Sequence, residues 1–201
     1  MPDHSALEVC YDGIELRLLN NSCKAILKEP TMLTAQEIIQ KLGLVPHPDE
    51  GGYFRETYRS TERIPASALP PRYPSEKAFN TAIYYLLTPE TSSQMHRLLS
   101  EEIFHFYLGD TVEMVILYPD GHAEQKFLGT DIDHGEQVQL VIPRSTWFGG
   151  FLKAGGRYAL MGTTVAPGFD YADYETGNRR ELILHYPGQK DLIRRLTPES
   201  G

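Results

Sequence analysis

Short apolar runs separated by turn residues fill the chain from about residue 46 onward. Runs of this length, rich in β-branched and aromatic residues, are typical of β-strands. No helical pattern lies between them, so a parallel α/β fold is excluded and a mainly β sandwich or barrel is predicted. We expect strands at residues 51–60, 78–87, 103–108, 112–118, 123–129, 137–143, 146–153 and 157–167.

Helical patterns lie on either side of this region. Thr34 and Glu37 form a capping box, an apolar face follows, and Gly43 ends the pattern, so a short helix is predicted at residues 34–42. At the C-terminal end, Asn178 and Glu181 can cap another helical turn, and residues 190–196 continue as a helix after a Pro-Gly pair. The pattern therefore predicts one domain at residues 34–201.

Residues 1–33 form an N-terminal arm with one alternating segment, residues 13–19. The alternation is typical of a half-buried strand. No local partner for it is evident, so we expect it to join a sheet elsewhere, across the interface of a homodimer. Cys10 and Cys23 also lie in this arm, and without an export signal we expect two reduced thiols.

Composition narrows the classes of function. The formal net charge is -8 and Lys and Arg occur in no cluster larger than a pair, which argues against nucleic-acid and anionic-membrane partners. No apolar stretch approaches the roughly 18 to 20 residues of a membrane span, and the polar, acidic start is no secretory signal. We expect a soluble cytoplasmic protein whose partner is a small molecule.

The chemistry gathers in residues 94–110, where charged and imidazole groups interrupt a strongly apolar strand. Burying such groups unpaired costs several kcal/mol, so they are satisfied in the core or line a cavity. Alternation places Glu102 inward and Glu101 on the opposite face. His96 is a ligand, a base or a structural histidine. His105 faces away from Glu102 in a regular strand, unless a bulge turns both inward; otherwise it is a core histidine bonded to a backbone carbonyl.

The spacing in this stretch resembles the first motif of cupin barrels, in which two histidines one residue apart precede a glutamate and a glycine. His96, Leu98, Glu102 and Gly109 fall on those positions, and Pro143, Ser145 and Phe148 fall on the proline, glycine and histidine of the second motif. Leu98 and Phe148 therefore stand where the family has two of its four metal ligands.

Longer phrases are similar to one branch of RmlC-like cupins, a family of uncharacterised proteins. They include LGLVPHPDEGGYFRETYRS, NTAIYYLLTP, LYPDG, VIPRSTWFGG and APGFDYADYE, and they cover residues 34 to 196 in order. The resemblance implies a cupin jelly-roll β-barrel with an internal ligand cavity, assembled as a homodimer. The resemblance implies no particular reaction, because no reaction is assigned to this family.

Two kinds of catalysis fit this frame. His96, Glu102 and His105 are the candidates for a site with one divalent transition metal, as in an oxygenase or hydrolase, although Leu98 and Phe148 supply no ligand. Without a metal, which we favour, the cavity works by acid–base chemistry, as RmlC-type epimerases do with a histidine base and a tyrosine acid.

We therefore expect an isomerase, epimerase or lyase that acts on a small cyclic metabolite, and a non-catalytic ligand-binding protein is the further alternative. The predicted catalytic residues are His105, Glu102, His96 and Tyr84. The predicted substrate-binding residues are Tyr53, Arg55, Trp147, Phe148 and Glu50. His47, before Pro48, is a further histidine whose position relative to the cavity the spacing does not decide.

Overall fold

The computed structural model describes residues 9–11, 14–19, 22–27 and 33–198. It divides the chain into two compact units, residues 1–33 and 34–201. In the first unit, three antiparallel strands form one sheet in the order β1-β2-β3. They are β1 (Val9–Tyr11), β2 (Ile14–Leu19) and β3 (Ser22–Leu27).

The alternating segment at residues 13–19 is β2, and the expectation that it lacks a local partner is wrong. It pairs with β1 on one side and with β3 on the other, so both of its hydrogen-bonding edges are occupied. β2 therefore has no free edge with which to join a sheet of another subunit. The side chains of Cys10 and Cys23 lie outside the described part of the structure, and their reduced state stays a prediction.

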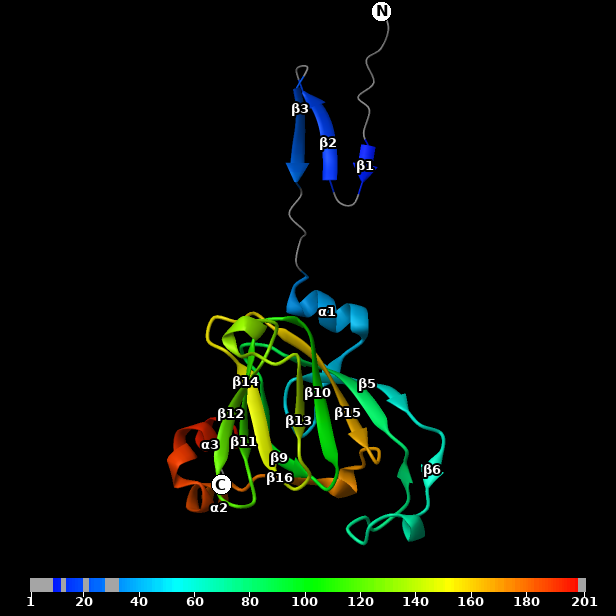
Figure 1. Ribbon diagram of the computed structural model, residues 1–201, viewed down its shortest axis with the longest axis vertical. Helices are drawn as coiled ribbons and strands as arrows, with labels where there is room; N and C mark the ends of the chain where they lie inside the picture. Colours follow the sequence, from blue (N-terminus) through cyan, green and yellow to red (C-terminus); the bar gives the residue numbers. More distant parts are fainter. Residues whose placement is uncertain (1–8, 12–13, 20–21, 28–32, 199–201) are drawn as a thin grey trace, which may run out of the picture. The chain divides into compact units, whose positions relative to one another are not determined.

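The second unit contains two antiparallel sheets that enclose a common core (Figure 1). The six-stranded sheet has the order β13-β10-β15-β8-β5-β4, and the five-stranded sheet has the order β12-β11-β14-β9-β16. A small ribbon, β6 (Arg63–Ile64) and β7 (Lys77–Ala78), lies in the segment that joins β5 to β8. The six-stranded sheet consists of β4 (Val45–Pro46), β5 (Tyr53–Arg59), β8 (Thr81–Leu87), β10 (Glu101–Gly109), β13 (Gln139–Ile142) and β15 (Ala159–Ala166). The five-stranded sheet consists of β9 (Ser92–Leu98), β11 (Val112–Leu117), β12 (Ala123–Leu128), β14 (Trp147–Leu152) and β16 (Tyr174–Thr176).

The mainly β fold predicted from the sequence is confirmed, and the two sheets are compatible with a jelly roll. The expected hairpin is present, because β11 pairs with β12 across the Pro119-Asp120-Gly121 turn. Apolar side chains from both sheets fill the interior, among them Phe104, Met114, Ile116 and Phe148. Buried and exposed side chains alternate along β10: Glu102, Phe104 and Phe106 are buried, and Glu101 is exposed.

In the described part of this unit, three α-helices pack on the outer faces of the two sheets. The predicted N-terminal helix is α1 (Ala35–Leu42), with the Thr34–Glu37 capping box formed and Gly43 in the left-handed conformation. Its apolar face packs on the six-stranded sheet at Leu86 and Leu160. The predicted C-terminal helices are α2 (Arg179–His185), capped by the Asn178 side chain, and α3 (Lys190–Arg195). They pack on the outer side of the five-stranded sheet through an apolar cluster with Val115 and Leu117 (Figure 1).

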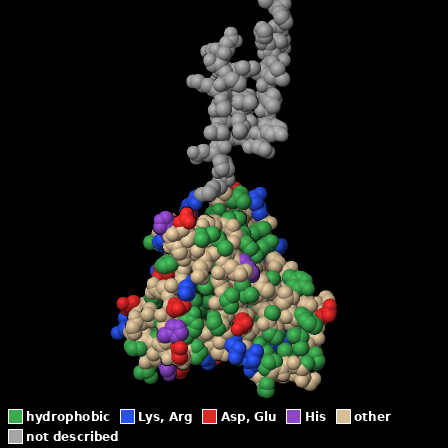
Figure 2. Space-filling model, in the orientation of Figure 1, with side chains coloured by type: hydrophobic (Ala, Val, Ile, Leu, Met, Phe, Trp, Pro, Cys, Tyr) green, Lys and Arg blue, Asp and Glu red, His purple; other side chains and the backbone are tan. Residues whose placement is uncertain are grey.

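Charged side chains of both signs are interspersed on the face of the second unit that Figure 2 shows. None of the described helices is long and apolar enough to cross a membrane.

Candidate functional site: a cavity with two buried carboxyl groups

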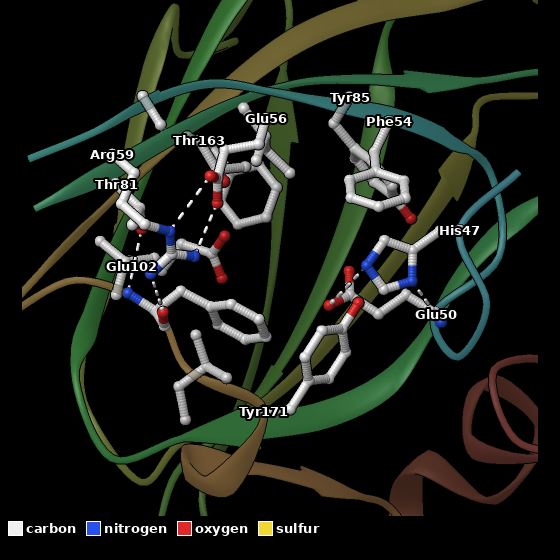
Figure 3. A pocket seen from close by; sticks show the side chains of 16 residues that line it. His47, Glu50, Phe54, Glu56, Arg59, Thr81, Tyr85, Glu102, Thr163 and Tyr171 are labelled. Atoms are coloured by element: carbon white, nitrogen blue, oxygen red, sulfur yellow. Dashed lines mark hydrogen bonds and ion pairs between the residues drawn. The ribbon is translucent and has the colours of Figure 1, made fainter. Parts of the chain in front are cut away.

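A cavity of about 80 Å³ lies inside the second unit, beside the core. That volume holds several water molecules or a small ligand. Strands β5, β8, β10 and β15 of the six-stranded sheet form most of its wall, with Leu98 of β9 opposite (Figure 3). Its apolar lining includes Phe54, Ile83, Leu98, Phe104, Val165 and Phe169, and its polar lining includes His47, Glu50, Glu56, Arg59, Thr81, Tyr85, Glu102, Thr163 and Tyr171.

Glu102 is the most deeply placed carboxyl group of this lining, and its side chain comes from the inward face of β10. The residue is 7% exposed, and its Oε2 atom makes no hydrogen bond with any described residue. Burial, reinforced by the nearby Glu50 carboxyl, raises the pKa of Glu102 to about 7. A buried carboxyl oxygen without a partner is costly unless a ligand or water satisfies it.

Glu50 is the second carboxyl group, and it belongs to the turn between β4 and β5. Its Oε1 atom lies 3.7 Å from Nε2 of His47 and 3.7 Å from Nε2 of His96. The side chain is 14% exposed. Burial raises the pKa of Glu50 to about 7, although the neighbouring His47 acts in the opposite direction. The Glu50 and Glu102 carboxyl groups therefore titrate as an interacting pair near neutral pH.

The two histidines that face Glu50 are held in opposite tautomers. His47 Nδ1 accepts hydrogen bonds from the backbone N–H groups of Asp49 and Glu50, at 3.3 and 3.0 Å, so neutral His47 carries its proton on Nε2. His96 Nδ1 donates to the Gln94 carbonyl at 2.7 Å, so neutral His96 presents a lone pair on Nε2. Glu50 thus lies between one ring nitrogen that donates and one that accepts.

Burial keeps both imidazoles in their neutral form. His96 is 1% exposed, and its ring packs against Phe148 at a centroid distance of 4.1 Å and stacks on Tyr174 at 5.1 Å. Burial lowers the pKa of His96, and the Glu102 carboxyl opposes this only in part. Burial also lowers the pKa of His47, against the opposing effect of Glu50. Both rings are therefore available as a neutral base or a neutral hydrogen-bond donor at physiological pH.

The opposite end of the cavity lining carries an ion pair. Arg59 donates from Nε and Nη2 to the two carboxylate oxygens of Glu56, at 3.1 and 2.6 Å, and from Nη1 to the Phe169 carbonyl at 3.0 Å. Figure 3 shows this pair and Glu102 on one side of the view, with His47, Glu50 and Tyr171 on the other. The cavity lining therefore contains a half-exposed ion pair and, in addition, two more deeply buried carboxyl groups.

The structure places His105 away from this cavity. Its side chain lies on the outer face of the six-stranded sheet, where Nε2 is 3.2 Å from the Thr164 hydroxyl and Nδ1 is 3.2 Å from the Gln139 amide. β10 is regular between Glu102 and His105, and its bulge comes later, between Phe106 and Leu108. The two side chains consequently point to opposite faces.

The expected metal-binding set of His96, Glu102 and His105 is not brought together, because His105 is on the outside. Among the residues that the structure describes, no group of three or more His, Cys, Asp and Glu side chains has an arrangement suited to a metal ion. The side chains at the two remaining cupin ligand positions do not coordinate metals either, since Leu98 lines the cavity and Phe148 packs on His96. The donors present do not fit the expected metal site.

Three other predicted residues also lie outside the cavity, on the outer face or its margin. Tyr84 meets Tyr107 edge-on at 6.1 Å, and the Arg55 guanidinium lies 5.5 Å from the centre of the Tyr84 ring. Tyr53 packs with the apolar cluster under α1. Tyr84, Arg55 and Tyr53 are therefore not brought into this cavity, because strand alternation turns their side chains away from the interior.

Trp147 and Phe148 do not form the expected ligand wall. Trp147 packs with the C-terminal helical cluster and carries the Arg97 guanidinium 4.4 Å from its ring centre. Phe148 is a core residue, 1% exposed, that does not line the cavity but packs against His96 and edge-on against the lining residue Phe104. Of the predicted site residues, the structure brings together His96, Glu102 and Glu50.

The sequence reasoning missed Tyr85 and Arg59 and left His47 undecided. Tyr85, 1% exposed, lines the cavity and donates from its hydroxyl to the Gly51 carbonyl at 2.8 Å. Arg59 reaches the cavity because the register of β5 shifts between Glu56 and Tyr58, which reverses the alternation after Glu56. In a regular strand only one of the neighbours Tyr84 and Tyr85 can face inward, and the register of the sheet decides which one.

Comparison with known proteins agrees with this architecture. A family model described as Cupin superfamily (DUF985), Cupin_5, matches residues 36–177. The chain therefore belongs to the cupin superfamily, and within it to the DUF985 family. The predicted resemblance to cupins is thereby confirmed.

The relatives found are similar over most of their length. The chain is 30% identical over 174 residues to the uncharacterized protein YML079W of Saccharomyces cerevisiae, which covers 82% of this chain and 85% of the yeast protein. A hypothetical protein from Leishmania major is 31% identical, with a TM-score of 0.75, and the match covers 83% of this chain and all of that one. Protein SO0799 from Shewanella oneidensis is 30% identical, with a TM-score of 0.74, covering 84% of this chain and all of the other. These names assign no reaction.

Proposed function

We propose that the protein is an acid–base enzyme, an isomerase, epimerase or lyase, that acts on a small cyclic metabolite in this cavity. One observation supports the proposal above the others: two buried carboxyl groups, Glu50 and Glu102, line one cavity together with His47. His96 does not line the cavity but contacts Glu50, and the two neutral imidazoles have opposite tautomers. Carboxyl groups with a pKa of about 7 exchange protons readily at neutral pH, which is the property that general acid–base catalysis needs.

The roles of the residues follow from their positions. Glu102, whose Oε2 has no partner among the described residues, removes a proton from a carbon next to a carbonyl group of the substrate. The bond electrons pass into the carbonyl, and Glu50 in its protonated form supplies the proton that the product needs. Neutral His47 and neutral His96 face Glu50 with an N–H group and a lone pair, so they orient this carboxyl group. After the reaction Glu102 releases its proton to water and Glu50 takes one up from water. No oxidant or reductant is required, because one proton leaves the substrate and one returns.

Exchange of substrate protons with solvent tests this proposal. Small cyclic hydroxy- and oxo-compounds are incubated with the protein in D₂O, and deuterium uptake at carbon is followed by NMR and mass spectrometry. We expect uptake with at least one compound, and Glu102→Gln should lower its rate by a factor of about 10² or more.

Two matched variants serve as controls. Glu101→Gln changes the exposed neighbour on the same strand, and His105→Gln changes the histidine on the outer face; both should exchange at the wild-type rate. Equal rates in Glu102→Gln and the wild type would contradict the proposal. Ligands that bind without any deuterium uptake would instead assign the cavity to a binding protein.

A further inference from the structure

Two carboxyl groups of the cavity lining lack a close charged or imidazole donor. Glu102 Oε2 is buried without a partner, and Glu50 Oε1 has no contact with a described imidazole shorter than 3.7 Å. His96, which contacts Glu50 but does not line the cavity, adds a lone pair on Nε2 because its Nδ1 proton is used by the Gln94 carbonyl. The His47 Nε2–H group is the one ring donor that faces Glu50. A ligand that satisfies this arrangement must bring N–H or O–H donors of its own.

The charges of the lining residues also favour a ligand that brings hydrogen-bond donors. Among the described residues that line the cavity, Arg59 is the one Lys or Arg, and Glu56 already holds its guanidinium through two hydrogen bonds. Lys77 is likewise held in an ion pair, since its ammonium group lies 2.8 and 2.7 Å from the two Asp173 carboxylate oxygens. The described lining therefore has no Lys or Arg left to neutralise Glu50 and Glu102.

The walls between these polar groups are apolar and largely aromatic. Phe54, Phe104, Phe169 and Tyr171 surround the space, and aromatic faces attract cations as well as hydrocarbon. An anionic ligand would meet two carboxyl groups with no free positive side chain inside. A neutral polyol would leave the negative charge of an ionised pair uncompensated.

We propose that the ligand of this cavity is a small organic cation, an ammonium or amidinium compound with a compact hydrocarbon part, held between Glu50 and Glu102. This inference names the substrate class of the proposed enzyme and in that sense rests on the proposed function. In the bound state the positive group lies between the Glu50 and Glu102 carboxyl groups, and the hydrocarbon part lies against the aromatic lining. One carboxylate then pairs with the cation while the other remains available for proton transfer.

Binding of three matched probes tests the inference without any turnover. Cyclopentylammonium, cyclopentanol and cyclopentanecarboxylate share a five-membered ring and differ in charge. Their affinities for the full-length protein are measured at pH 7.5 by calorimetry and by shifts in the NMR signals of Ile83. We expect the ammonium compound to bind at least tenfold more tightly than the alcohol, and the carboxylate not to bind.

Variants locate the binding to the carboxyl pair. Glu102→Gln and Glu50→Gln should each remove most of the preference for the ammonium compound, whereas Glu101→Gln on the exposed face of the same strand should keep it. Both Gln variants keep the shape of the side chain, and their thermal unfolding shows whether they are folded. A tighter fit of the alcohol or the carboxylate, or an unchanged preference in Glu102→Gln, would overturn the inference.

A divalent cation provides the last arm of the experiment. If Mn²⁺ or Zn²⁺ at equal concentration displaces cyclopentylammonium, and the metal's own binding is lost in both Gln variants, the cavity takes a metal ion and the organic-cation proposal fails. If the ammonium compound binds but no compound exchanges protons with solvent, the ligand class stands and the proposed catalytic function alone fails.

Discussion

At the residue scale, the protein has a carboxyl group at Glu102 whose burial in the ionised form costs free energy of folding. The side chain is buried among apolar walls, and one of its oxygens has no partner in the described structure. Folding alone favours its protonated form, because the desolvated carboxylate is unstable there. A buried carboxyl group with a raised pKa, which lowers the stability of the fold when it is ionised, is typical of a functional site.

The pH dependence of stability follows from the raised pKa of Glu102. The folded-state pKa of about 7 exceeds the ordinary value of 4.5, so the folded protein keeps a proton that the unfolded chain releases. The corresponding stability is complete below about pH 4.5 and is lost as the pH rises through 7. Because a tenfold difference in proton affinity is worth about 1.4 kcal/mol, the effect is on the order of 3 kcal/mol.

Glu102→Gln therefore should flatten the stability curve between pH 4.5 and 8 and raise the free energy of unfolding at pH 8. Urea denaturation at a series of pH values measures both effects. The matched variant Glu101→Gln, on the solvent side of the same strand, should follow the wild-type curve. A Glu102→Gln variant that loses stability at pH 8 would contradict the burial argument.

The tautomers of the two inner histidines form a second prediction at this scale. Neutral His96 should carry its proton on Nδ1 and neutral His47 on Nε2, because the Gln94 carbonyl accepts and the Glu50 backbone N–H donates. Long-range ¹H–¹⁵N NMR spectra at pH 7.5 distinguish the two forms directly. Finding the same tautomer in both rings would contradict the proposed orientation of Glu50 between an N–H group of His47 and a lone pair of His96.

At the scale of elements, a buried ion pair ties two distant segments together beside the cavity. Lys77 of β7 and Asp173, in the segment after β15, have side chains only 1% and 2% exposed. The Asp173 segment also carries Phe169 and Tyr171, which line the cavity. The ion pair therefore fixes part of the cavity wall. Removing one partner leaves a buried charge without compensation.

Lys77→Met should destabilise the protein by about 3–5 kcal/mol, because the Asp173 carboxylate is then buried alone. The double variant Lys77→Met with Asp173→Leu should recover most of that loss, since no charge remains. Urea denaturation measures both free energies of unfolding. The interpretation fails if the single variant is as stable as the wild type, or if the double variant is no better than the single one.

At the scale of the whole molecule, we propose that the protein is a homodimer, as the resemblance to cupins suggested. The pairing of β2 with both β1 and β3 removes that strand as the means of association. Light scattering at micromolar concentration should give about twice the chain mass of 22.8 kDa. A mass of one chain under these conditions would refute the dimer.

The sequence by itself determined the local elements and the family. The α1 capping box, the β11–β12 hairpin, the Asn178 cap and the inward position of Glu102 all depend on contacts between residues close in the chain, and periodicity records them. Spacing of His96, Glu102 and Gly109 likewise indicated the cupin frame. These signals are local, so a single sequence suffices to identify them.

Only the tertiary structure decided which side chains meet in the cavity. The phase of alternation in β8 selects Tyr85 over Tyr84, and a shift of register in β5 brings Arg59 inward while Arg55 stays outside. Glu50 lies between His47 and His96 because a turn and a strand from different sheets converge there. Such proximity depends on pairing between distant segments, and no spacing along the chain encodes it.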